Sequence, residues 1–277
     1  MSLLSIITIN FNNKKGLEKT ITSLINQSFK DYEYIVIDGG STDGSVEVIR
    51  RYSDKLNYWV SEPDKGIYNA MNKGIRKATG KYCLFLNSGD RLTDKNILSQ
   101  VFSISFSEDL VYGNTLYDNM CQTYPEKISL TYLISKSLPH QSTFIKKSLF
   151  ESIGFYNEEN KIVSDWEFFL KAIQLHSCSY KYLSGITISK LESPGISQQM
   201  KHITTRYTET EKVFKSLIVP ILQKKLKSPE EHDEINEVFI KLYHNRDSKL
   251  VRQALKFENS KFFNSLRRIY YRLNKSN

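Results

Sequence analysis

The chain lacks most of the features that mark secreted, disulfide-stabilised or membrane-spanning proteins. Its 277 residues include only three cysteines, Cys83, Cys121 and Cys178. An odd and widely spaced set predicts neither a disulfide framework nor a metal-binding pair, and it fits a reducing cytoplasm. No stretch approaches the ~20 apolar residues that a membrane-spanning helix needs. Residues 1–10 lack the basic lead and the cleavage site of a secretory signal, so we expect them to form a first strand.

Two nucleotide-binding signatures are also missing. The sequence contains no G-x-G-x-x-G and no G-x-x-x-x-G-K-[ST], which removes the best support for a dinucleotide-binding or P-loop protein. The composition is that of a globular protein, with 40% hydrophobic and 25% charged residues. A net charge of +9 allows nucleic acid, anionic lipid or anionic small substrates as partners. We expect no nucleic acid, because no aromatic-plus-basic RNA-binding motif accompanies the charge.

Short apolar runs alternate with segments of helical spacing in the first ninety residues. We expect strands near residues 3–9, 34–37, 57–61 and 83–86, with helices between them. Strands that alternate with helices at short spacing predict an α/β fold whose central sheet is mostly parallel and flanked by helices. The pattern weakens after Arg91, where we expect a helix that begins at a Thr93 cap, a strand and turn over 110–114, and a turn that runs into a strand over 138–145.

Each of the four predicted strands ends in a polar loop, and these loops cover residues 10–13, 38–43, 64–66 and 87–90. Right-handed crossovers place the carboxyl ends of parallel strands at one edge of a sheet, so the loops should converge there. Asp90 follows a buried strand and can be the protein's share of a site for a hard divalent cation. The alternative is a plain β-turn, because Asn, Ser, Gly and Asp are the standard turn residues.

Three further positions carry candidate chemistry. Asp38 can accept hydrogen bonds from a base or ribose, or it can form a helix-capping turn with Asp43. His140 follows a proline and is either a structural histidine or a group that orients a hydroxyl or phosphate. Asp165 begins a helix, where a cap at Ser164 and the positive helix end explain an acid without any function. Alternatively, Asp165 is a general base beside an apolar platform for a sugar ring at Trp166.

Taken together, these motifs resemble glycosyltransferase family 2, whose members have a GT-A fold. They occur in the family's order and cover roughly residues 3 to 195. The segments that carry the resemblance are Ser5-Ile6-Ile7-Thr8-Ile9-Asn10-Phe11-Asn12, Val36-Ile37-Asp38-Gly39-Gly40-Ser41-Thr42-Asp43-Gly44-Ser45, Glu62-Pro63-Asp64-Lys65-Gly66-Ile67-Tyr68-Asn69-Ala70-Met71-Asn72-Lys73-Gly74, Phe85-Leu86-Asn87-Ser88-Gly89-Asp90 and Ser164-Asp165-Trp166-Glu167.

The resemblance implies an inverting, metal-dependent transfer of a sugar from a nucleotide diphosphate donor to a hydroxyl. We expect a UDP-sugar donor, with GDP- and dTDP-sugars as alternatives, and a glycan or lipid-linked glycan acceptor. The sequence is similar to transferases of exopolysaccharide, O-antigen and capsule synthesis, which implies a role in surface polysaccharide synthesis. A nucleotide-binding or scaffolding protein with a degenerate site is the alternative from another functional class.

The same resemblance implies a role for each site residue. Asp90 is implied to bind Mg²⁺ or Mn²⁺ on the diphosphate, and Asp165 to be the base toward the acceptor. The implied nucleotide-sugar-binding residues are Ile9, Asn10, Asp38, Asp64, Lys65, Asn87 and Ser88. The acceptor side is expected to include His140, Gln141, Trp166 and Glu167, and Glu167 can share the base role.

Two positions depart from the family's pattern. Gly39 stands where the family often has a second acid after the second strand. The turn that matches the family's D-x-D motif, Asn87 to Asp90, carries only one acid. A single carboxylate predicts a modest metal affinity that depends on the donor phosphates.

The character of the chain changes near residue 198. We expect a glycosyltransferase domain over residues 1–197 and a basic helical extension over 198–277. Helical spacing of apolar residues with basic residues between them predicts an amphipathic helix near the end of the chain, over 261–275. It can bind the inner face of the cell membrane peripherally. Alternatively, it packs on the domain or pairs with another chain as a homodimer.

Overall fold

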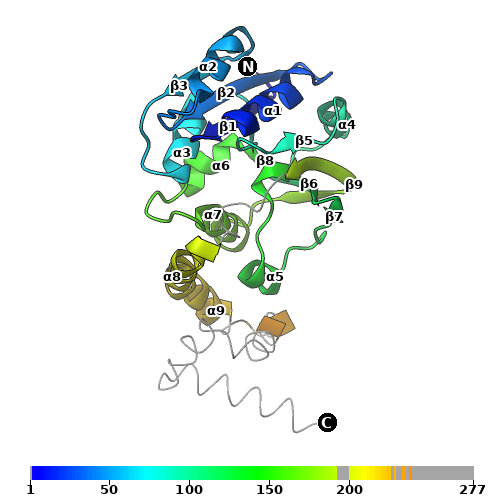
Figure 1. The fold of residues 1–277 in the computed structure, drawn as a ribbon. Coiled ribbons are helices and arrows are strands. Elements are labelled where there is room, and N and C mark those ends of the chain that lie inside the picture. Colours follow the sequence, from blue (N-terminus) through cyan, green and yellow to red (C-terminus); the bar gives the residue numbers. More distant parts are fainter. Residues whose placement is uncertain (1, 192–199, 226–227, 229–232, 235–236, 239–277) are drawn as a thin grey trace. The chain divides into compact units, whose positions relative to one another are not determined.

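The computed structural model describes residues 2–191, 200–225, 228, 233–234 and 237–238. The chain divides into two compact units (Figure 1). The first comprises Met1–Glu126 and Ser137–Ile203, and the second Lys127–Lys136 and Thr204–Asn277. The domain boundary expected at residue 198 falls outside the described residues and stays a prediction. The amphipathic helix expected over 261–275 also lies outside them.

The first unit is built around a nine-stranded sheet with the order β3-β2-β1-β4-β8-β6-β9-β5, and β7 pairs with β6. Its strands are β1 (Leu4–Asn10), β2 (Tyr32–Asp38), β3 (Tyr58–Ser61), β4 (Tyr82–Phe85), β5 (Arg91–Leu92), β6 (Leu110–Tyr117), β7 (Met120–Gln122), β8 (Thr143–Lys146) and β9 (Tyr180–Leu191). Strands β1 to β4 are parallel to their neighbours within this group. The predicted α/β fold and its parallel strands are therefore confirmed.

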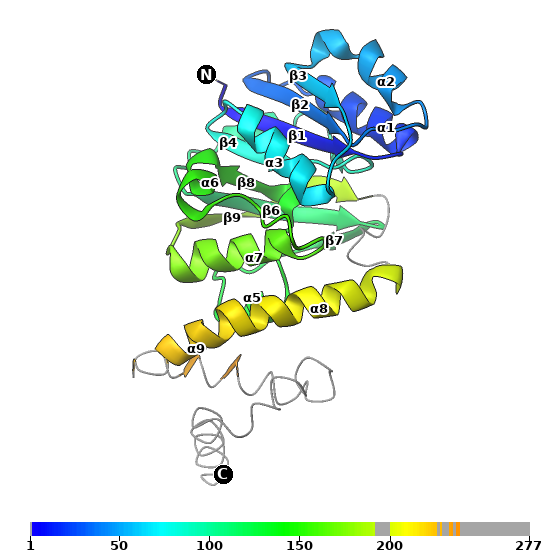
Figure 2. The same ribbon diagram turned by 90° about the vertical axis from the view of Figure 1, so that its left-hand side faces the viewer.

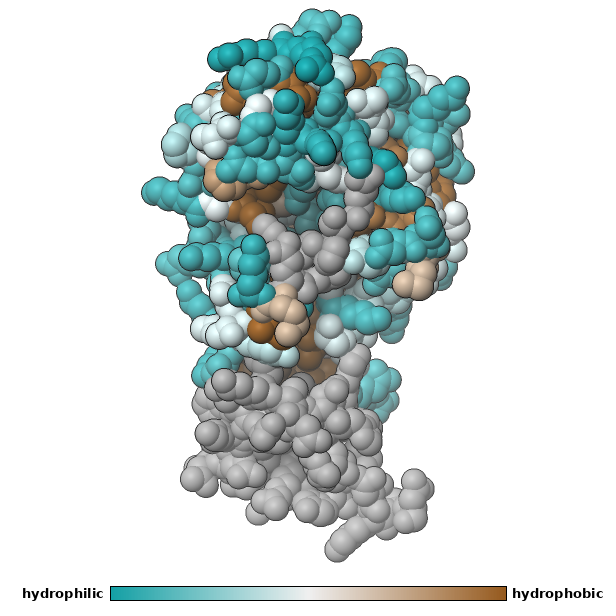
Figure 3. All heavy atoms as spheres, viewed as in Figure 1, coloured by the Kyte–Doolittle hydropathy of each residue, from teal (hydrophilic) through white to brown (hydrophobic). Residues whose placement is uncertain are grey.

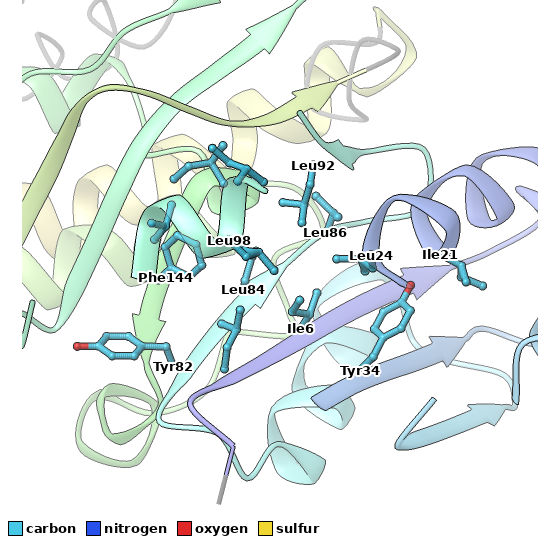
Figure 4. Packing of buried hydrophobic residues seen from close by; sticks show 14 of the residues in the cluster. Ile6, Ile21, Leu24, Tyr34, Tyr82, Leu84, Leu86, Leu92, Leu98 and Phe144 are labelled. Atoms are coloured by element: carbon cyan, nitrogen blue, oxygen red, sulfur yellow. The ribbon is translucent and has the colours of Figure 1, made fainter. Parts of the chain in front are cut away.

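Successive side chains of β1 face opposite sides of the sheet and pack against different helices. Ile6 belongs to a buried cluster with Leu24 of helix α1 and Leu98 of helix α4, and Figure 4 shows these side chains on the same side of the strands. Ile7 points to the other face, where helix α3 crosses it (Figure 2). Because successive side chains of a strand face opposite sides, a run of apolar residues can fill both layers at once.

Helices cover both faces of the sheet. One face carries α1, α2 and α4, whose apolar residues join a single buried cluster with the even-numbered residues of β1 and β4. The other face carries α3, and there Phe85 of β4 packs edge-on against Phe150 of α6. The helices of this unit are α1 (Lys14–Ile25), α2 (Ser45–Arg51), α3 (Ile67–Lys77), α4 (Ile97–Phe102), α6 (Lys147–Ile153) and α7 (Ser164–Leu170). The surface near α1 and α2 is largely hydrophilic in Figure 3.

The half of the sheet beyond β4 is mixed. Strand β8 is antiparallel to both β4 and β6, whereas β6 and β9 are parallel. The turn and strand expected over 138–145 are confirmed, as a turn of 3₁₀ helix over His140–Ser142 followed by β8 from Thr143. The turn expected at the end of 110–114 is wrong, because β6 continues to Tyr117. The expected cap at Thr93 is wrong. Its hydroxyl donates to the Thr187 carbonyl at 2.6 Å, and α4 begins only at Ile97.

The second unit is helical where it is described. It contains α5 (Leu130–Ser135), most of α8 (Ile203–Val213) and α9 (Val219–Lys225). Glu234 connects two of these helices, because its carboxylate accepts the Leu130 amide proton at 2.7 Å and pairs with Lys225 at 2.9 Å. None of the helices in the described part of the chain combines the length and the apolarity that a bilayer crossing requires.

A glycine sets the distance between α3 and β1. A Cβ atom added at Gly74 would lie 2.4 Å from Cγ2 of Ile7, which is closer than carbon atoms can approach. The missing side chain lets the helix pack directly on the central strand. The position of α3 matters for the site, because its first turn carries residues that reach the acceptor side.

We expect Gly74→Ala to destabilise the fold. The better helix propensity of alanine contributes up to about 1 kcal/mol, whereas overpacking costs about 1–3 kcal/mol, so the net loss should be about 1–2 kcal/mol. Urea unfolding measures the change. The double variant Ile7→Ala/Gly74→Ala is the control. It should be less destabilised than the sum of the single variants, because the colliding methyl group is gone, and strict additivity would contradict the packing argument.

Candidate active site

The loops after the parallel strands meet at one edge of the sheet, as predicted. Asn10 at the end of β1 donates from Nδ2 to Oδ1 of Asp38 at the end of β2, at 2.7 Å. Ser61 at the end of β3 donates to Oδ2 of the same carboxylate at 2.6 Å. The loop after β4 joins them through the amide of Ser88, which donates to the Ile9 carbonyl at 3.1 Å.

Asp38 is the centre of this network. Its side chain is fully buried and accepts four hydrogen bonds, from Asn10, from Ser61, and from both the hydroxyl and the amide of Ser41. Burial opposes ionisation of the carboxyl, but hydrogen bonds from Ser41, Ser61 and Asn10 outweigh it and hold the pKa of Asp38 below its usual value. The helix-capping contact belongs to Asp43, which accepts the Ser45 amide proton at 3.0 Å.

The turn after β4 is held in place by a residue that sequence patterns did not indicate. The amide of Asp90 donates to the carbonyl of Asn87 at 2.9 Å, and Gly89 has a φ of +107°, which favours glycine. Thr20 of α1 is fully buried behind this turn. Its hydroxyl accepts from the Gly89 amide at 2.9 Å and donates to the Asp90 carbonyl at 2.7 Å. The turn is therefore fixed to α1 on both sides of Gly89.

Asp64 explains why residue 39 is a glycine. A Cβ atom at Gly39 would lie 2.4 Å from Oδ2 of Asp64 and 3.2 Å from the ring of Phe11. Asp64 also accepts the Gly66 amide proton at 2.8 Å, next to the exposed Lys65. Phe11 is 64% exposed, so this edge presents one aromatic face to solvent. The sequence predicted Asp64 and Lys65 at the site but gave no role to Phe11.

A chain of hydrogen bonds connects the β4 turn to the candidate base. Nδ2 of Asn87 lies 3.2 Å from Nε2 of His140, and Nδ1 of His140 lies 2.9 Å from Oδ2 of Asp165. With Nδ2 of Asn87 donating to Nε2 of His140, the proton on Nδ1 donates a hydrogen bond to the Asp165 carboxylate. Asn87 lies in the loop after β4, His140 in the turn before β8, and Asp165 in α7.

Asp165 is held on several sides. Its Oδ1 lies 2.9 Å from the hydroxyl of Tyr68 on α3 and accepts the Trp166 amide proton at 2.9 Å. Burial opposes ionisation, but hydrogen bonds from His140 and Tyr68 dominate and leave the pKa of Asp165 below its usual value. The side chain keeps 16% of its surface exposed. Asp165 is therefore a fixed carboxylate that solvent and small molecules can reach.

The other acceptor-side residues lie in different surroundings. Glu167 is 9% exposed and accepts from Asn160 at 2.7 Å, while it pairs with Lys171 at 2.6 Å. The geometry thus separates Glu167, which fixes a loop, from Asp165. Trp166 is 8% exposed and offers little ring surface to a sugar. Gln141 is half-buried in the 3₁₀ turn beside His140.

The expected cap at Ser164 is wrong. The residue before α7 is Val163, and Ser164 is the first residue inside the helix. The Ser164 hydroxyl is buried without a hydrogen-bond partner among the described residues. Asp165 and Glu167 still lie in the first turn of α7, where the positive helix end favours acids.

Helix α3 also anchors the loop that precedes α7. Asn69 and Asn72 donate to the two oxygens of Glu158 at 2.7 and 2.8 Å. Asn72 additionally bonds both the amide and the carbonyl of Tyr156, at 3.1 and 2.9 Å. The motif that runs from Ile67 to Gly74 thus fixes the loop that leads to Asp165. Sequence spacing did not indicate these contacts, because their partners lie more than eighty residues away.

The β4 turn offers oxygen ligands for a divalent cation. Oδ1 of Asn87 is buried and has no hydrogen-bond partner among the described residues, and Asp90 ends the same turn. An amide oxygen and a carboxylate suit a hard cation such as Mg²⁺ or Mn²⁺. In the described part of the chain, no group of three or more His, Cys, Asp or Glu side chains is arranged to hold a metal. The residues fit an ion that is also held by other ligands.

A family model described as glycosyl transferase family 2 matches residues 5–164. The chain belongs to this family. Among curated family 2 relatives, a PGL/p-HBAD biosynthesis glycosyltransferase of Mycobacterium bovis is 29% identical over 202 residues, which is 70% of this chain and 79% of the relative. An uncharacterised glycosyltransferase of Mycobacterium tuberculosis is 34% identical over 180 residues, covering 61% of this chain and 68% of the relative.

Solved structures support the GT-A fold that the resemblance implied. Residues 1–349 of Staphylococcus aureus TarS, in complex with UDP-GlcNAc, match with a TM-score of 0.69 at 18% identity, covering 94% of this chain and 77% of that one. A longer TarS chain is covered to 46% of its length. The mannosyltransferase PcManGT of Pyrobaculum calidifontis, in complex with GDP-Man and Mn²⁺, matches with a TM-score of 0.62 at 16% identity. The match covers 98% of this chain and 80% of the PcManGT chain.

Asp38→Asn should destabilise the protein at neutral pH by about 2–3 kcal/mol, because an amide cannot accept all the donors that face the carboxylate. The folded-state pKa of Asp38 lies below its unfolded value of about 3.9. Its contribution is therefore fully present above that value and is lost as the pH falls through the folded-state pKa. The stability difference between wild type and variant should shrink in acid.

Urea unfolding between pH 7 and pH 3 measures this difference. Asp54→Asn is the matched control, since Asp54 is 69% exposed beside Lys55 and should change little. An Asp38→Asn variant as stable as wild type at pH 7 would contradict the structural role of this carboxylate.

Proposed function

We propose that this protein is an inverting glycosyltransferase that moves a sugar from a nucleotide diphosphate sugar to an acceptor hydroxyl. The main support is the arrangement of Asp165, which is an ionised carboxylate held by His140 and joined through Asn87 to the turn that ends in Asp90. A base and a diphosphate-binding turn are the two parts that such a displacement needs, and they lie at the same edge of the sheet.

In the proposed reaction, the acceptor oxygen attacks the anomeric carbon of the donor sugar. The acceptor O–H bond breaks and its proton passes to Asp165, which acts as the general base. The bond from the anomeric carbon to the diphosphate breaks on the opposite face, and its electron pair leaves with the diphosphate. One displacement of this kind inverts the anomeric centre.

We infer a UDP-sugar as the donor, because the TarS structures that this chain resembles hold UDP and UDP-GlcNAc. GDP- and dTDP-sugars are the alternatives, and the PcManGT complex contains GDP-Man. The implied donor residues include Ile9, Asn10, Asp38, Asp64 and Lys65, which gather at the ends of the first three parallel strands. The exposed ring of Phe11 lies among them and is suited to stacking on a nucleobase.

We propose that Asp90 and Asn87 hold Mg²⁺ or Mn²⁺, with the donor phosphates and water as the other ligands. When bound, such an ion supplies Lewis-acid stabilisation of the charge on the leaving diphosphate. Thr20 keeps the Asn87–Asp90 turn in place for this role, and Ser88 fixes it to β1. The PcManGT structure contains Mn²⁺, which agrees with the use of a divalent ion on this fold.

For the acceptor we propose a glycan or a lipid-linked glycan in surface polysaccharide synthesis. A curated relative is named a PGL/p-HBAD biosynthesis glycosyltransferase, which supports a role for this protein as a biosynthetic transferase. His140, Gln141 and the loop before α7 face this side. We further propose a cytoplasmic protein that contacts the inner face of the cell membrane through its C-terminal basic segment, or that pairs there as a homodimer.

A panel of UDP-, GDP- and dTDP-sugars tests the proposal. We expect hydrolysis of at least one UDP-sugar with Mg²⁺ or Mn²⁺, and complete loss of turnover in excess EDTA, because the diphosphate would leave without charge neutralisation. Released nucleotide diphosphate is measured, and restored turnover on re-addition of the metal is the control. Nucleotide binding without any turnover would favour the scaffolding alternative, which a turn with one acid suggests. Full activity in EDTA would contradict the role of Asp90.

Asp165→Asn should lower kcat by about 10²- to 10⁴-fold, because the amide cannot accept the acceptor proton. Nucleotide affinity, measured by calorimetry, should stay near that of wild type, since Asp165 lies on the acceptor side. Glu167→Gln is the comparison, because Glu167 bonds Asn160 and Lys171 and should affect stability more than kcat. Equal losses of binding and turnover in Asp165→Asn would argue for a structural role instead.

A further inference from the structure

The hydroxyl of Tyr68 faces two acceptors with one proton. Its oxygen lies 2.8 Å from the carbonyl of Ile162 and 2.9 Å from Oδ1 of Asp165. A phenol has a single O–H, so it can donate to only one of them at a time. The same group therefore has a second hydrogen-bond position available without any movement of its ring.

The ring itself is fixed. Tyr68 is 5% exposed, and its ring packs against Tyr156 with the centroids 5.5 Å apart. Burial and the neighbouring charge of Asp165 raise the pKa of Tyr68 well above its usual value, so the hydroxyl keeps its proton throughout the neutral range. Tyr68 is thus a neutral donor and not a competing base.

The protonation state of Asp165 decides whether the Tyr68 hydroxyl donates to Asp165 or to Ile162. A carboxylate is the stronger acceptor, because charge-assisted hydrogen bonds are stronger than neutral ones. Once Asp165 has accepted a proton its charge is gone, and the closer Ile162 carbonyl becomes the better partner. The Trp166 amide still donates to Oδ1 at 2.9 Å in either state.

This second position matters for the strength of the base. A hydrogen-bond donor that served only the carboxylate would hold Asp165 in place but would also lower its basicity, because it would stabilise the charged form alone. A hydroxyl that can turn to Ile162 loses little when the carboxylate becomes neutral. It can therefore fix the orientation of Asp165 at a small cost in basicity.

We propose that Tyr68 is a positioning residue for the Asp165 base, and that its hydroxyl alternates between Asp165 and the Ile162 carbonyl as the base gains and loses its proton. This inference rests on the proposed function. It assigns a role to the first turn of α3, which reaches the acceptor side because Gly74 lets the helix pack closely on β1.

Tyr68→Phe tests the proposal, with Tyr156→Phe as the matched control. Both changes remove a buried hydroxyl from one aromatic cluster, but the Tyr156 hydroxyl has no hydrogen-bond partner among the described residues. We expect Tyr68→Phe to lower kcat about 10- to 100-fold through misplacement of the base. Donor affinity should stay within about twofold of wild type, because Tyr68 is buried and its hydroxyl faces Asp165 and Ile162. Tyr156→Phe should keep the wild-type kcat.

The pH profile separates positioning from simple pKa tuning. The titratable groups that face Asp165 are His140 before β8, Tyr68 on α3 and Tyr156 before α7. If the Tyr68 hydroxyl donated to the carboxylate alone, its loss should move the acid limb of the pH profile of kcat to higher pH by more than about one unit. If the hydroxyl alternates between its two acceptors, Tyr68→Phe should move the acid limb upward by less than this and should also lower the plateau value of kcat.

Three results would overturn the proposal. These are an unchanged kcat in Tyr68→Phe, an upward movement of more than about one pH unit with an unchanged plateau, and equal losses in Tyr68→Phe and Tyr156→Phe. Carbon-13 NMR titration of the Asp165 carboxyl in wild type and Tyr68→Phe gives a reading that needs no turnover. If the wild type fails to transfer sugar, the proposed function fails, and this titration still tests the contact.

Discussion

The two hydrogen bonds of His140, one to Asn87 and one to Asp165, join the parallel half of the sheet to helix α7, and the site depends on both. His140 lies in a turn before the antiparallel strand β8, whereas Asn87 lies in the loop that follows the parallel strand β4. Without these bonds, the carboxylate would lie near the β4 turn but would not be fixed relative to it. Inversion at a sugar carbon needs the base and the leaving group on opposite faces, so their relative position decides whether the site can work.

Much of the parallel half could be predicted from the sequence, because its signals are local. A short apolar run, a polar loop and a helical segment define each β–α unit, and the handedness of the crossover then places every loop at one edge. The convergence of Asn10, Asp38 and Ser88 follows from that rule alone. Asp165 could be named as a candidate in the same way, since an acid at a helix start within a family motif is a local pattern, and its role as the base stays a prediction.

The residues that escaped prediction act over long distances in the chain. Thr20 bonds a turn about seventy residues away, and Tyr68 meets Asp165 nearly a hundred residues later. Each looks like an ordinary helix residue, because nothing in its neighbourhood shows what its hydroxyl will meet. The caps expected at Thr93 and Ser164 were wrong for a related reason. A hydroxyl before a helix is a good cap only when no tertiary partner or helix start displaces it.

The two departures from the family's pattern are consistent with the surrounding contacts. Gly39 leaves the space that the Asp64 carboxylate occupies, so the acid missing after β2 is replaced in space by one from the β3 loop. Asn87 faces Nε2 of His140, and its amide can donate to that nitrogen while the ring donates from Nδ1 to Asp165. An aspartate at position 87 would present a second acceptor to the ring and compete with Asp165 for its proton. The asparagine therefore leaves the imidazole proton on the Asp165 side, while its amide oxygen, which has no hydrogen-bond partner among the described residues, remains suited to a cation.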